Sequence, residues 1–309
     1  RGNGASPVEL LEQDRKAVFT HPDITDNLMT QVVFNGSKAF GSNLTLSGNA
    51  YYRRLRTNTF NGDGTIFEEC EIDGDEYLVE EDFDDLDEDG ECSGADSFEL
   101  VLDRFGQPIE AELDDEELTA INNIGTRKQI SRGASLQLAH VLDLGDGRRN
   151  DLTLGAAWQR GSSRFKSDVE VVQLTEERAT TRTGIFADEY STFMNSRVTT
   201  WSLYAADTLD LSRNLSLTAS ARYDSTRIRL NDLSGQDPEL NGSHKFDRVN
   251  PALGLVWRGT NGLVAYATLS QASRAPTAVE LACADEDAPC SLPNAFLAEP
   301  ALDEVVARS

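Results

Sequence analysis

The chain has 309 residues, with 28 Lys and Arg against 53 Asp and Glu, and a net charge of −25 at pH 7. This charge excludes a nucleic-acid partner, because binding phosphates requires a positive surface. The mean hydropathy of −0.42 and the lack of an apolar run of about 18 residues exclude a helical membrane protein. A membrane β-barrel stays open, since its strands need only every second residue to be apolar.

Six segments alternate apolar and polar residues with a period of two, which is typical of strands with one apolar face. In the segment LSLTASARYD, the apolar residues occupy the odd-numbered positions of 215–224. No long segment has a helical period, beyond a single turn at Val8–Gln13. We therefore predict an all-β, antiparallel up-and-down fold of roughly ten strands. In chain order the six segments are 44–52, 134–138, 152–158, 215–224, 249–257 and 263–269.

The acidic charge is concentrated in one insertion at 61–120. It holds 25 Asp and Glu but one basic residue, Arg104, so its charge is −24 and the rest of the chain carries −1. Crowded like charges repel one another and stay hydrated. The run EEDFDDLDEDGE at 80–91 therefore predicts an exposed and loosely ordered loop.

Carboxylates in this run recur at the spacing of a calcium-binding loop. Asp85, Asp87 and Asp89 stand at positions one, three and five, and Gly at position six. Calcium prefers such hard oxygen ligands. Solvated acidity without an ion is the alternative, and no other cofactor is expected. The candidate metal ligands are Asp85, Asp87, Asp89, Glu91 and Asp96, the last being shorter than the Glu usual at the twelfth position.

The four cysteines form two local pairs, Cys70 with Cys92 and Cys283 with Cys290. Neither pair has CxxC spacing or a neighbouring His, which disfavours a zinc site. Both pairs fall in polar, loop-like segments, so we predict two loop-closing disulfides and an oxidising compartment. Four free thiols in a cytosolic protein are the alternative.

The connections between strands alternate strictly between short and long. The short ones, at 36–43, 144–150, 210–214 and 258–262, are rich in residues that tolerate turn geometry. In a meander every second connection lies at the same end, so all the long ones share one end. This asymmetry is typical of outer-membrane barrels, which have short periplasmic turns and long extracellular loops. We predict the long loops at about 58–125, 161–195, 230–246 and 273–303.

Two late segments resemble the barrel of TonB-dependent outer-membrane receptors. RVNPALGLVW at 248–257 has the Asn-Pro start and the central Gly of one strand of that family. LVAYATLSQASRAPTAVEL at 263–281 carries the next strand into an Arg-Ala-Pro stretch, and a Pro-x-Leu element follows at 300–302. The segments at 204–224 and 150–158 are similar to the family's mid-barrel pattern. The resemblance covers most of the chain from Leu28 onward.

The resemblance implies a barrel of roughly 22 strands around a plug domain, of which residues 1–309 form a partial barrel domain. The chain opens at Arg1 without an initiator Met or a signal peptide, so we expect an internal fragment that lacks the plug, the TonB-contacting segment and the closing strands. The implied location is the outer membrane of a Gram-negative bacterium. The implied function is energy-coupled uptake of a scarce solute such as an iron–siderophore complex, without catalysis. The implied partners are the TonB complex through the missing N-terminal region, an extracellular metal chelate or other large solute, and outer-membrane lipid.

The long loops are the expected ligand-facing parts of such a receptor. Aromatic and Arg side chains supply most of the recognition energy at interfaces, although each of them could instead pack the loops together. The acidic mouth would repel anionic ferric siderophores and favour neutral or cationic cargo, or would serve divalent cations and surface sugars instead. The candidate ligand-binding residues are Tyr77, Phe83, Arg104, Phe105, Tyr190, Phe193 and Phe296.

Two other classes of protein stay open at this stage. One is a passive outer-membrane porin or adhesin barrel without a plug, and the other is a secreted, soluble β-sheet binding protein. A plug domain upstream of Arg1 would favour the receptor over the porin. Purification from the aqueous phase without detergent would exclude both barrel classes.

Overall fold

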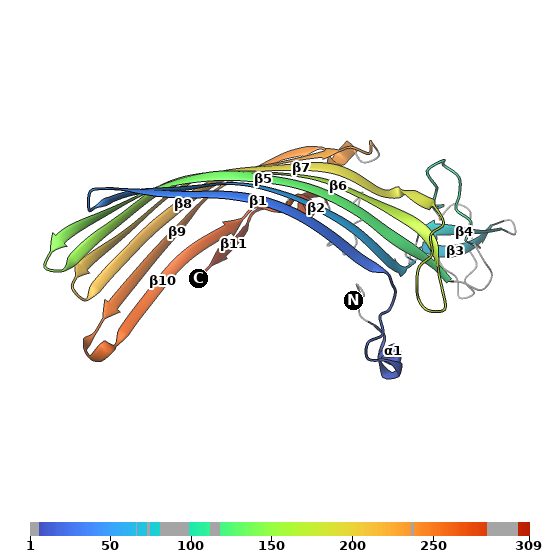
Figure 1. Ribbon diagram of the computed structural model, residues 1–309, viewed down its shortest axis with the longest axis horizontal. Coiled ribbons are helices and arrows are strands. Elements are labelled where there is room, and N and C mark those ends of the chain that lie inside the picture. The colour runs from blue at the N-terminus through green and yellow to red at the C-terminus, as the bar shows by residue number, and fades with distance from the viewer. Residues whose placement is uncertain are drawn as a thin grey trace.

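The computed structural model describes residues 6–65, 67–72, 75–80, 99–111, 118–235, 238–282 and 302–309. Its main element is a sheet of nine strands that follow one another in chain order (Figure 1). Neighbouring strands are antiparallel throughout, as in an up-and-down barrel wall. The strands are β1 (Asp23–Phe40), β2 (Leu44–Gly64), β5 (Leu118–Gly145), β6 (Arg148–Leu174), β7 (Ile185–Ser212), β8 (Leu215–Asp232), β9 (Gly242–Arg258), β10 (Val264–Arg274) and β11 (Val305–Arg308).

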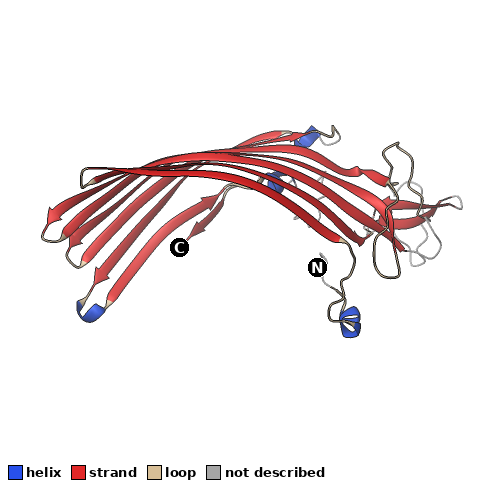
Figure 2. Cartoon of the chain, in the orientation of Figure 1, coloured by secondary structure: helices blue, strands red, loops and turns tan. Residues whose placement is uncertain are grey.

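Strands dominate the cartoon in Figure 2, which confirms the prediction of an antiparallel all-β fold. A separate hairpin of β3 (Phe67–Ile72) and β4 (Asp75–Glu80) lies in the insertion after β2. No helix of the described residues is long and apolar enough to cross a membrane. The helical segments are α1 (Val8–Gln13), α2 (Ala278–Ala282) and the 3-10 turns η1 (Pro238–Leu240) and η2 (Thr260–Gly262).

Short turns and long connections lie at opposite ends of the sheet. The turns at 41–43, 146–147, 213–214 and 259–263 lie at one end, drawn at the left of Figure 1. Asp146 and Gly147 between β5 and β6 have φ angles of 54° and 72°. An Asp-Gly pair favours this tight hairpin geometry, because both residues tolerate a positive φ. The long connections, 65–117, 175–184, 233–241 and 275–304, join the strands at the other end.

The strands run past the predicted loop bounds. β6 continues to Leu174 and β7 begins at Ile185, so most of the loop expected at 161–195 is paired strand. The loops expected at 58–125 and 230–246 are shortened in the same way. Both faces of β6 are mostly polar between about residues 160 and 168, and apolar residues lie on both faces from 169 to 174. The period of two therefore disappears from the sequence there, while backbone pairing with the neighbouring strands continues.

The strand register sorts the side chains onto two faces. One row runs from Leu138 through Leu154, Ala205 and Ala221 on successive strands, and it belongs to what we call the apolar face. Leu136 and Leu203 on this face are each 61% exposed. The described residues thus leave a wide band of aliphatic side chains uncovered, which marks a surface that contacts lipid or another apolar partner. The opposite, polar face carries Ser, Asn, Gln, Thr and Arg.

The largest hydrophobic core lies beyond the apolar band, at the end with the long connections. The insertion after β2 packs there against the polar-face side of the strand ends, through contacts with Ile121 of β5 and Val169 and Val171 of β6. Full burial of an aliphatic side chain contributes about 1.5–3 kcal/mol, so these contacts hold a highly charged segment onto the sheet. We call this set the cap cluster: Phe67, Leu78, Val101, Ile109, Ala111, Ile121, Val169, Val171 and Ala187.

Candidate functional site on the polar face and the cap

Hydrogen bonds between side chains knit the polar face across neighbouring strands. Asn49 Nδ2 donates to Ser135 Oγ (2.9 Å), which links β2 to β5. Arg222 on β8 donates to Asp224 (2.9 and 3.0 Å) and to Ser202 of β7 (2.8 Å). A surface whose polar groups bond one another in this way is suited to contact water and polar solutes rather than lipid.

A shallow polar hollow of about 420 Å³ lies on this face between β1, β2 and β5. Its lining has no charged residue. Small residues and short amides let the wall recede here and present neutral donors and acceptors. The hollow can therefore hold water or the hydroxyl and amide groups of a polar solute. The lining residues are Asn35, Gly36, Ser37, Ser47, Gly48, Asn49, Ser135 and Gln137.

Two tyrosines lie over glycines on the same face. Tyr204 of β7 crosses Gly155 of β6, and a Cβ atom on Gly155 would lie 2.0 Å from Tyr204 Cζ. From this position Tyr204 donates its hydroxyl to Gln137 Oε1 of β5 (3.0 Å). Tyr51 covers Gly133 in the same manner, with a Cβ-to-ring distance of 2.7 Å. Each glycine leaves room for a flat ring, and the ring protects a strand position that lacks a side chain.

The described part of the insertion after β2, together with the first part of β7 that packs against it, is here called the cap, and it holds four of the predicted ligand-binding residues. Tyr190 packs edge-to-face on Phe67 of the cap cluster, with ring centroids 4.9 Å apart. The Arg104 guanidinium stacks 4.1 Å from the Phe186 ring centroid. Phe105 is 82% exposed, in a turn where Asp103 Oδ1 accepts from the Phe105 and Gln107 amides. Tyr77 is half-buried in β4, opposite Cys70.

Two of the expected loop residues lie in a strand. Tyr190 and Phe193 belong to β7, which starts at Ile185 and so includes the last part of the loop expected at 161–195. Phe193 lies in register with Lys166 on the apolar-face side, where Arg164 stacks on its ring at 5.9 Å. Its placement in a loop is therefore wrong, while its role in ligand binding stays a prediction. The reason is that the first part of β7 carries apolar and polar residues on both faces, so the sequence shows no alternation there.

The other candidate residues of the acidic insertion and the last long connection lie outside the described residues. Cys70, the one cysteine within them, is buried and disulfide-bonded. Its pairing with Cys92 stays a prediction, as does the second pair. The described part of the chain contains no group of three metal-ligating side chains. The positions outside the description are Phe83, Phe296, Asp85, Asp87, Asp89, Glu91, Asp96, Cys92, Cys283 and Cys290.

A buried carboxylate that the sequence pattern does not reveal holds the hairpin between β6 and β7. Glu170 is fully buried. It accepts hydrogen bonds from Arg182 Nε (2.7 Å), the Gly184 amide (2.9 Å) and Asn122 Nδ2 (3.1 Å). A buried charge is tolerated when it is paired and hydrogen-bonded in this way. Glu170 thereby ties the connection at 175–184 to the strand ends.

The Arg-Ala-Pro stretch after β10 leads into a capped helix. Arg274 donates two hydrogen bonds to Glu280 (2.8 and 2.9 Å). Thr277 and Glu280 form a reciprocal cap, in which the Thr277 amide donates to Glu280 (2.6 Å) and the Glu280 amide to Thr277 Oγ1 (3.1 Å). The Arg274 guanidinium, with a smaller effect of the Thr277 amide, lowers the pKa of Glu280 from 4.5 to about 2.

The sequence from residue 6 to 305 matches the family model described as TonB dependent receptor-like, beta-barrel. The chain therefore belongs to the TonB-dependent receptor barrels, a family of non-enzymatic transport proteins of the outer membrane of Gram-negative bacteria. Membership confirms the predicted family, fold class and location. It also identifies the apolar face as the lipid-facing wall and the polar face as the barrel interior. No curated protein matches the chain in sequence.

Three solved receptors share the fold at low sequence identity. The ferric citrate transporter FecA has a TM-score of 0.53 at 10% identity, over 85% of this chain and 30% of its own. The open form of the ferric-catecholate import receptor Fiu from E. coli K12 has 0.54 at 12%, over 84% and 38%. The siderophore receptor PiuA from Acinetobacter baumannii has 0.50 at 11%, over 81% and 33%. The chain thus spans about a third of the solved receptors' length.

Proposed function

We propose that this chain is part of a receptor for the energy-coupled uptake of a scarce solute such as an iron–siderophore complex. The observation that carries the proposal is the separation of functions over the sheet. One face of the sheet is apolar, and the other is a polar wall with hydrogen bonds between its side chains. The long connections all lie at one end of the sheet. This arrangement fits a barrel that captures a solute at its outer mouth and conducts it along a wet interior. The long connections are then extracellular.

The cap and the polar hollow supply the contacts for the solute in this proposal. Phe105 is the strongest candidate, because its ring is exposed and its turn is fixed by Asp103. Arg104 follows, although it already stacks on Phe186. Further down the wall, neutral amides and hydroxyls around Asn49 and Ser135 would pass the solute on without trapping it. The relatives named for ferric citrate, ferric-catecholate and siderophore uptake support an iron chelate as the class of cargo.

The charge of the insertion indicates which kind of iron chelate the receptor prefers. Its −24 charge sets up a negative field near the mouth that reaches about one Debye length into solution, roughly 8–10 Å. The field opposes the approach of an anionic chelate and attracts a cationic one. We therefore propose a neutral or cationic iron chelate as the preferred cargo.

Energy in this proposal comes from the TonB complex, through a segment outside this chain. The test measures iron uptake by cells that carry the full-length receptor as their single outer-membrane receptor, with chelates of different charge. Uptake is expected to stop when TonB is inactivated or the proton gradient is collapsed. Uptake that continues under both treatments would instead identify a passive porin. A Phe105→Ala variant should weaken chelate binding while leaving receptor abundance unchanged.

A further inference from the structure

Basic side chains gather on the lipid-facing wall just past its apolar band. The register aligns Arg132, Arg160, Thr199, Arg227 and Lys245 in a single row across five strands. The next row toward the short turns contains Trp158 and Trp201, whose ring centroids are 6.1 Å apart. Aromatic residues of this kind mark the level of the lipid head groups in membrane proteins. The basic row therefore begins where the bilayer core ends.

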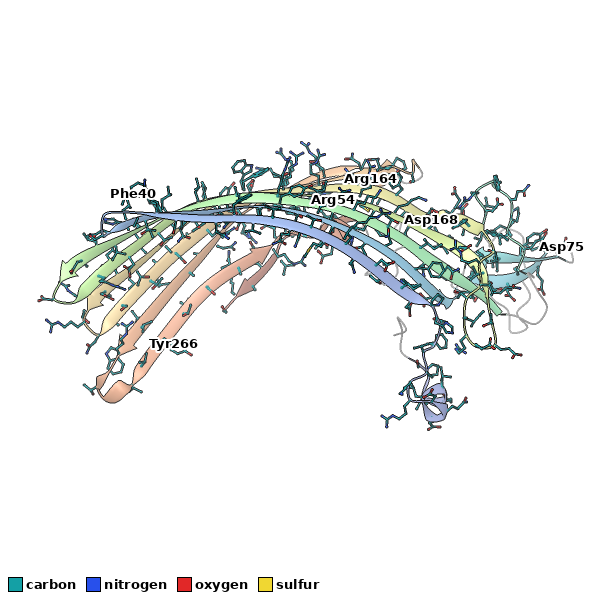
Figure 3. All side chains as sticks on the ribbon, in the orientation of Figure 1. Phe40, Arg54, Asp75, Arg164, Asp168 and Tyr266 are labelled. Carbon is teal, nitrogen blue, oxygen red and sulfur yellow. The ribbon has the colours of Figure 1, made fainter. Side chains whose placement is uncertain are left out.

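Three cations of this row and two from the next row line one pocket of about 260 Å³ between β6 and β9. We call it the cationic pocket, made by Arg160, Arg197, Arg227, Arg229 and Lys245, with Trp201 on the side of the apolar band. Figure 3 labels Arg54 and Arg164, which continue the basic surface and lie farther from the short turns than Phe40. The surface is positive even though the chain carries a net charge of −25.

Four of the five cations of the pocket have no carboxylate partner among the described residues. Within the described residues, Lys245 is paired with Asp247, whereas Arg160, Arg197, Arg227 and Arg229 form no ion pair. The Arg197 Nε atom is buried and has no hydrogen-bond partner. By contrast, Arg222, Arg182 and Arg274 each pair with a carboxylate. Unpaired guanidinium groups that line one pocket repel one another, so the pocket favours an anion.

A second hollow on the same strands indicates what kind of molecule carries that anion. It has a volume of about 530 Å³, and apolar side chains such as Leu154, Leu203 and Tyr223 line it. The two hollows follow each other along β7 and β8, since Leu203 and Tyr223 lie two positions from Trp201 and Ser225 of the cationic pocket. An apolar groove that leads into a cluster of arginines matches a lipid, with its acyl chain below and its head group above.

We propose that the cationic pocket binds the phosphate groups of an anionic lipid in the outer leaflet, with its acyl chain in the apolar hollow. Arginine binds phosphate with two parallel hydrogen bonds, and several clustered arginines favour a head group that bears more than one phosphate. The assignment to the outer leaflet rests on the proposed orientation, in which the long connections are extracellular. Binding itself does not depend on transport.

The test measures lipid retention by the full-length receptor in phosphatidylcholine nanodiscs. One preparation contains a minor fraction of a diglucosamine lipid with two phosphates, and the other contains the same lipid with one phosphate. Mass spectrometry then counts the lipid bound to the purified protein. We expect the lipid with two phosphates to be retained more strongly. Its retention should fall about tenfold in the Arg197→Gln/Arg229→Gln variant, because two charge-assisted hydrogen-bond donors are lost.

The matched control is Arg53→Gln/Arg127→Gln, which removes two cations from the opposite, interior face of β2 and β5. Retention by this variant should equal that of the wild type. Equal retention of both lipids by the wild-type receptor, or equal loss in both variants, would overturn the proposal. So would displacement of the lipid by inorganic phosphate, which would identify a site for a soluble anion. Labelling of the cap in intact cells tests the orientation separately, so a failure of the proposed function is told apart from a failure of lipid binding.

Discussion

Single residues on the interior face control how closely the strands pack, and Gly155 is the clearest case. Its place under Tyr204 leaves no room for a methyl group. A Gly155→Ala change should therefore displace the ring, break its bond to Gln137 and destabilise the barrel by about 1–3 kcal/mol, the usual cost of overpacking. Denaturant titration of the full-length receptor in lipid would measure the change.

Gly161 provides the control for this prediction. It lies on the same strand and the same face, and a Cβ atom there would meet its nearest neighbour, Ser131 Oγ, at 3.9 Å. The Gly161→Ala variant should be as stable as the wild type or slightly more so, because alanine reduces the freedom of the unfolded chain. Equal effects of the two substitutions would contradict the steric explanation.

The pair Arg274–Glu280 makes the cap of α2 sensitive to acid. The pKa of Glu280 is lowered from 4.5 to about 2, so the carboxylate binds its proton more weakly in the folded state. Its stabilising contribution is complete above about pH 4.5 and is lost as the pH falls toward 2. Protection of the Thr277 amide from hydrogen exchange should decline over this range, and Glu280→Gln should weaken it already at neutral pH, because a neutral amide no longer forms an ion pair with Arg274.

The exposed Glu9 of α1 gives the comparison for that experiment. Glu9→Gln changes a carboxylate in the first turn of a helix with no side-chain cap, and it should leave Thr277 unaffected. Protection of Thr277 that stays constant down to pH 2 would show that the ion pair does not hold the cap. Because Arg274 is about half exposed, water screens its charge. We therefore expect the Arg274–Glu280 ion pair to contribute little to the overall stability.

At the level of elements, the connection at 175–184 depends on Glu170. A Glu170→Ala change leaves the buried Asn122 without one of its acceptors and frees Arg182, which is 61% exposed and can rehydrate. We expect a local loss of about 1–3 kcal/mol and faster tryptic cleavage after Arg178 or Arg182 in the folded receptor. Glu176→Gln, an exposed change in the same hairpin, should cleave at the wild-type rate. Equal cleavage in both variants would show that Glu170 does not anchor the hairpin.

The same hairpin illustrates how far the sequence predicts the fold. Strand centres such as those of β6 and β8 are visible because one face meets lipid and the other meets water, which imposes a period of two. The ends of β6 and β7 are not visible in this way, because the cap cluster and other protein contacts bury residues on both faces there, so the apolar residues no longer alternate with polar ones. The short β3 and β4 are stabilised by the cap cluster, whose partners outside the hairpin lie more than 20 residues away in the chain. No local pattern records such contacts.

The candidate site was predictable to a similar degree. The alternation alone predicts which residues face the barrel interior. Asn49, Ser135 and Gln137 could therefore be assigned to the polar wall from the sequence. The overlap of Tyr204 with Gly155, by contrast, depends on the register between β6 and β7, which a single sequence does not determine. Glu170 and the cationic pocket share this property. The signal that was available is the repeat of basic residues two positions apart, as in Arg54 with Arg56 and Arg227 with Arg229.

At the level of the whole molecule, the acidic insertion should act as a charge filter at the mouth of the barrel. Replacing exposed acids of its described part, Asp75→Asn with Glu76→Gln, reduces the negative field where a chelate arrives. The capture rate of an anionic iron chelate should rise about two- to threefold at low salt, and that of a cationic chelate should fall by a similar factor. Stopped-flow binding to the full-length receptor would measure both rates.

Two features separate this long-range effect from a change in the binding site. Added salt should remove the difference between variant and wild type, because mobile ions shorten the field to about 3 Å at 1 M. The control Asp143→Asn with Asp146→Asn removes the same charge at the short-turn end of β5, the opposite end of the sheet, and should leave both rates unchanged. Rate changes that persist at high salt would mean that the insertion contacts the chelate directly. Rate changes that appear equally in the control would mean that the insertion does not select cargo by charge.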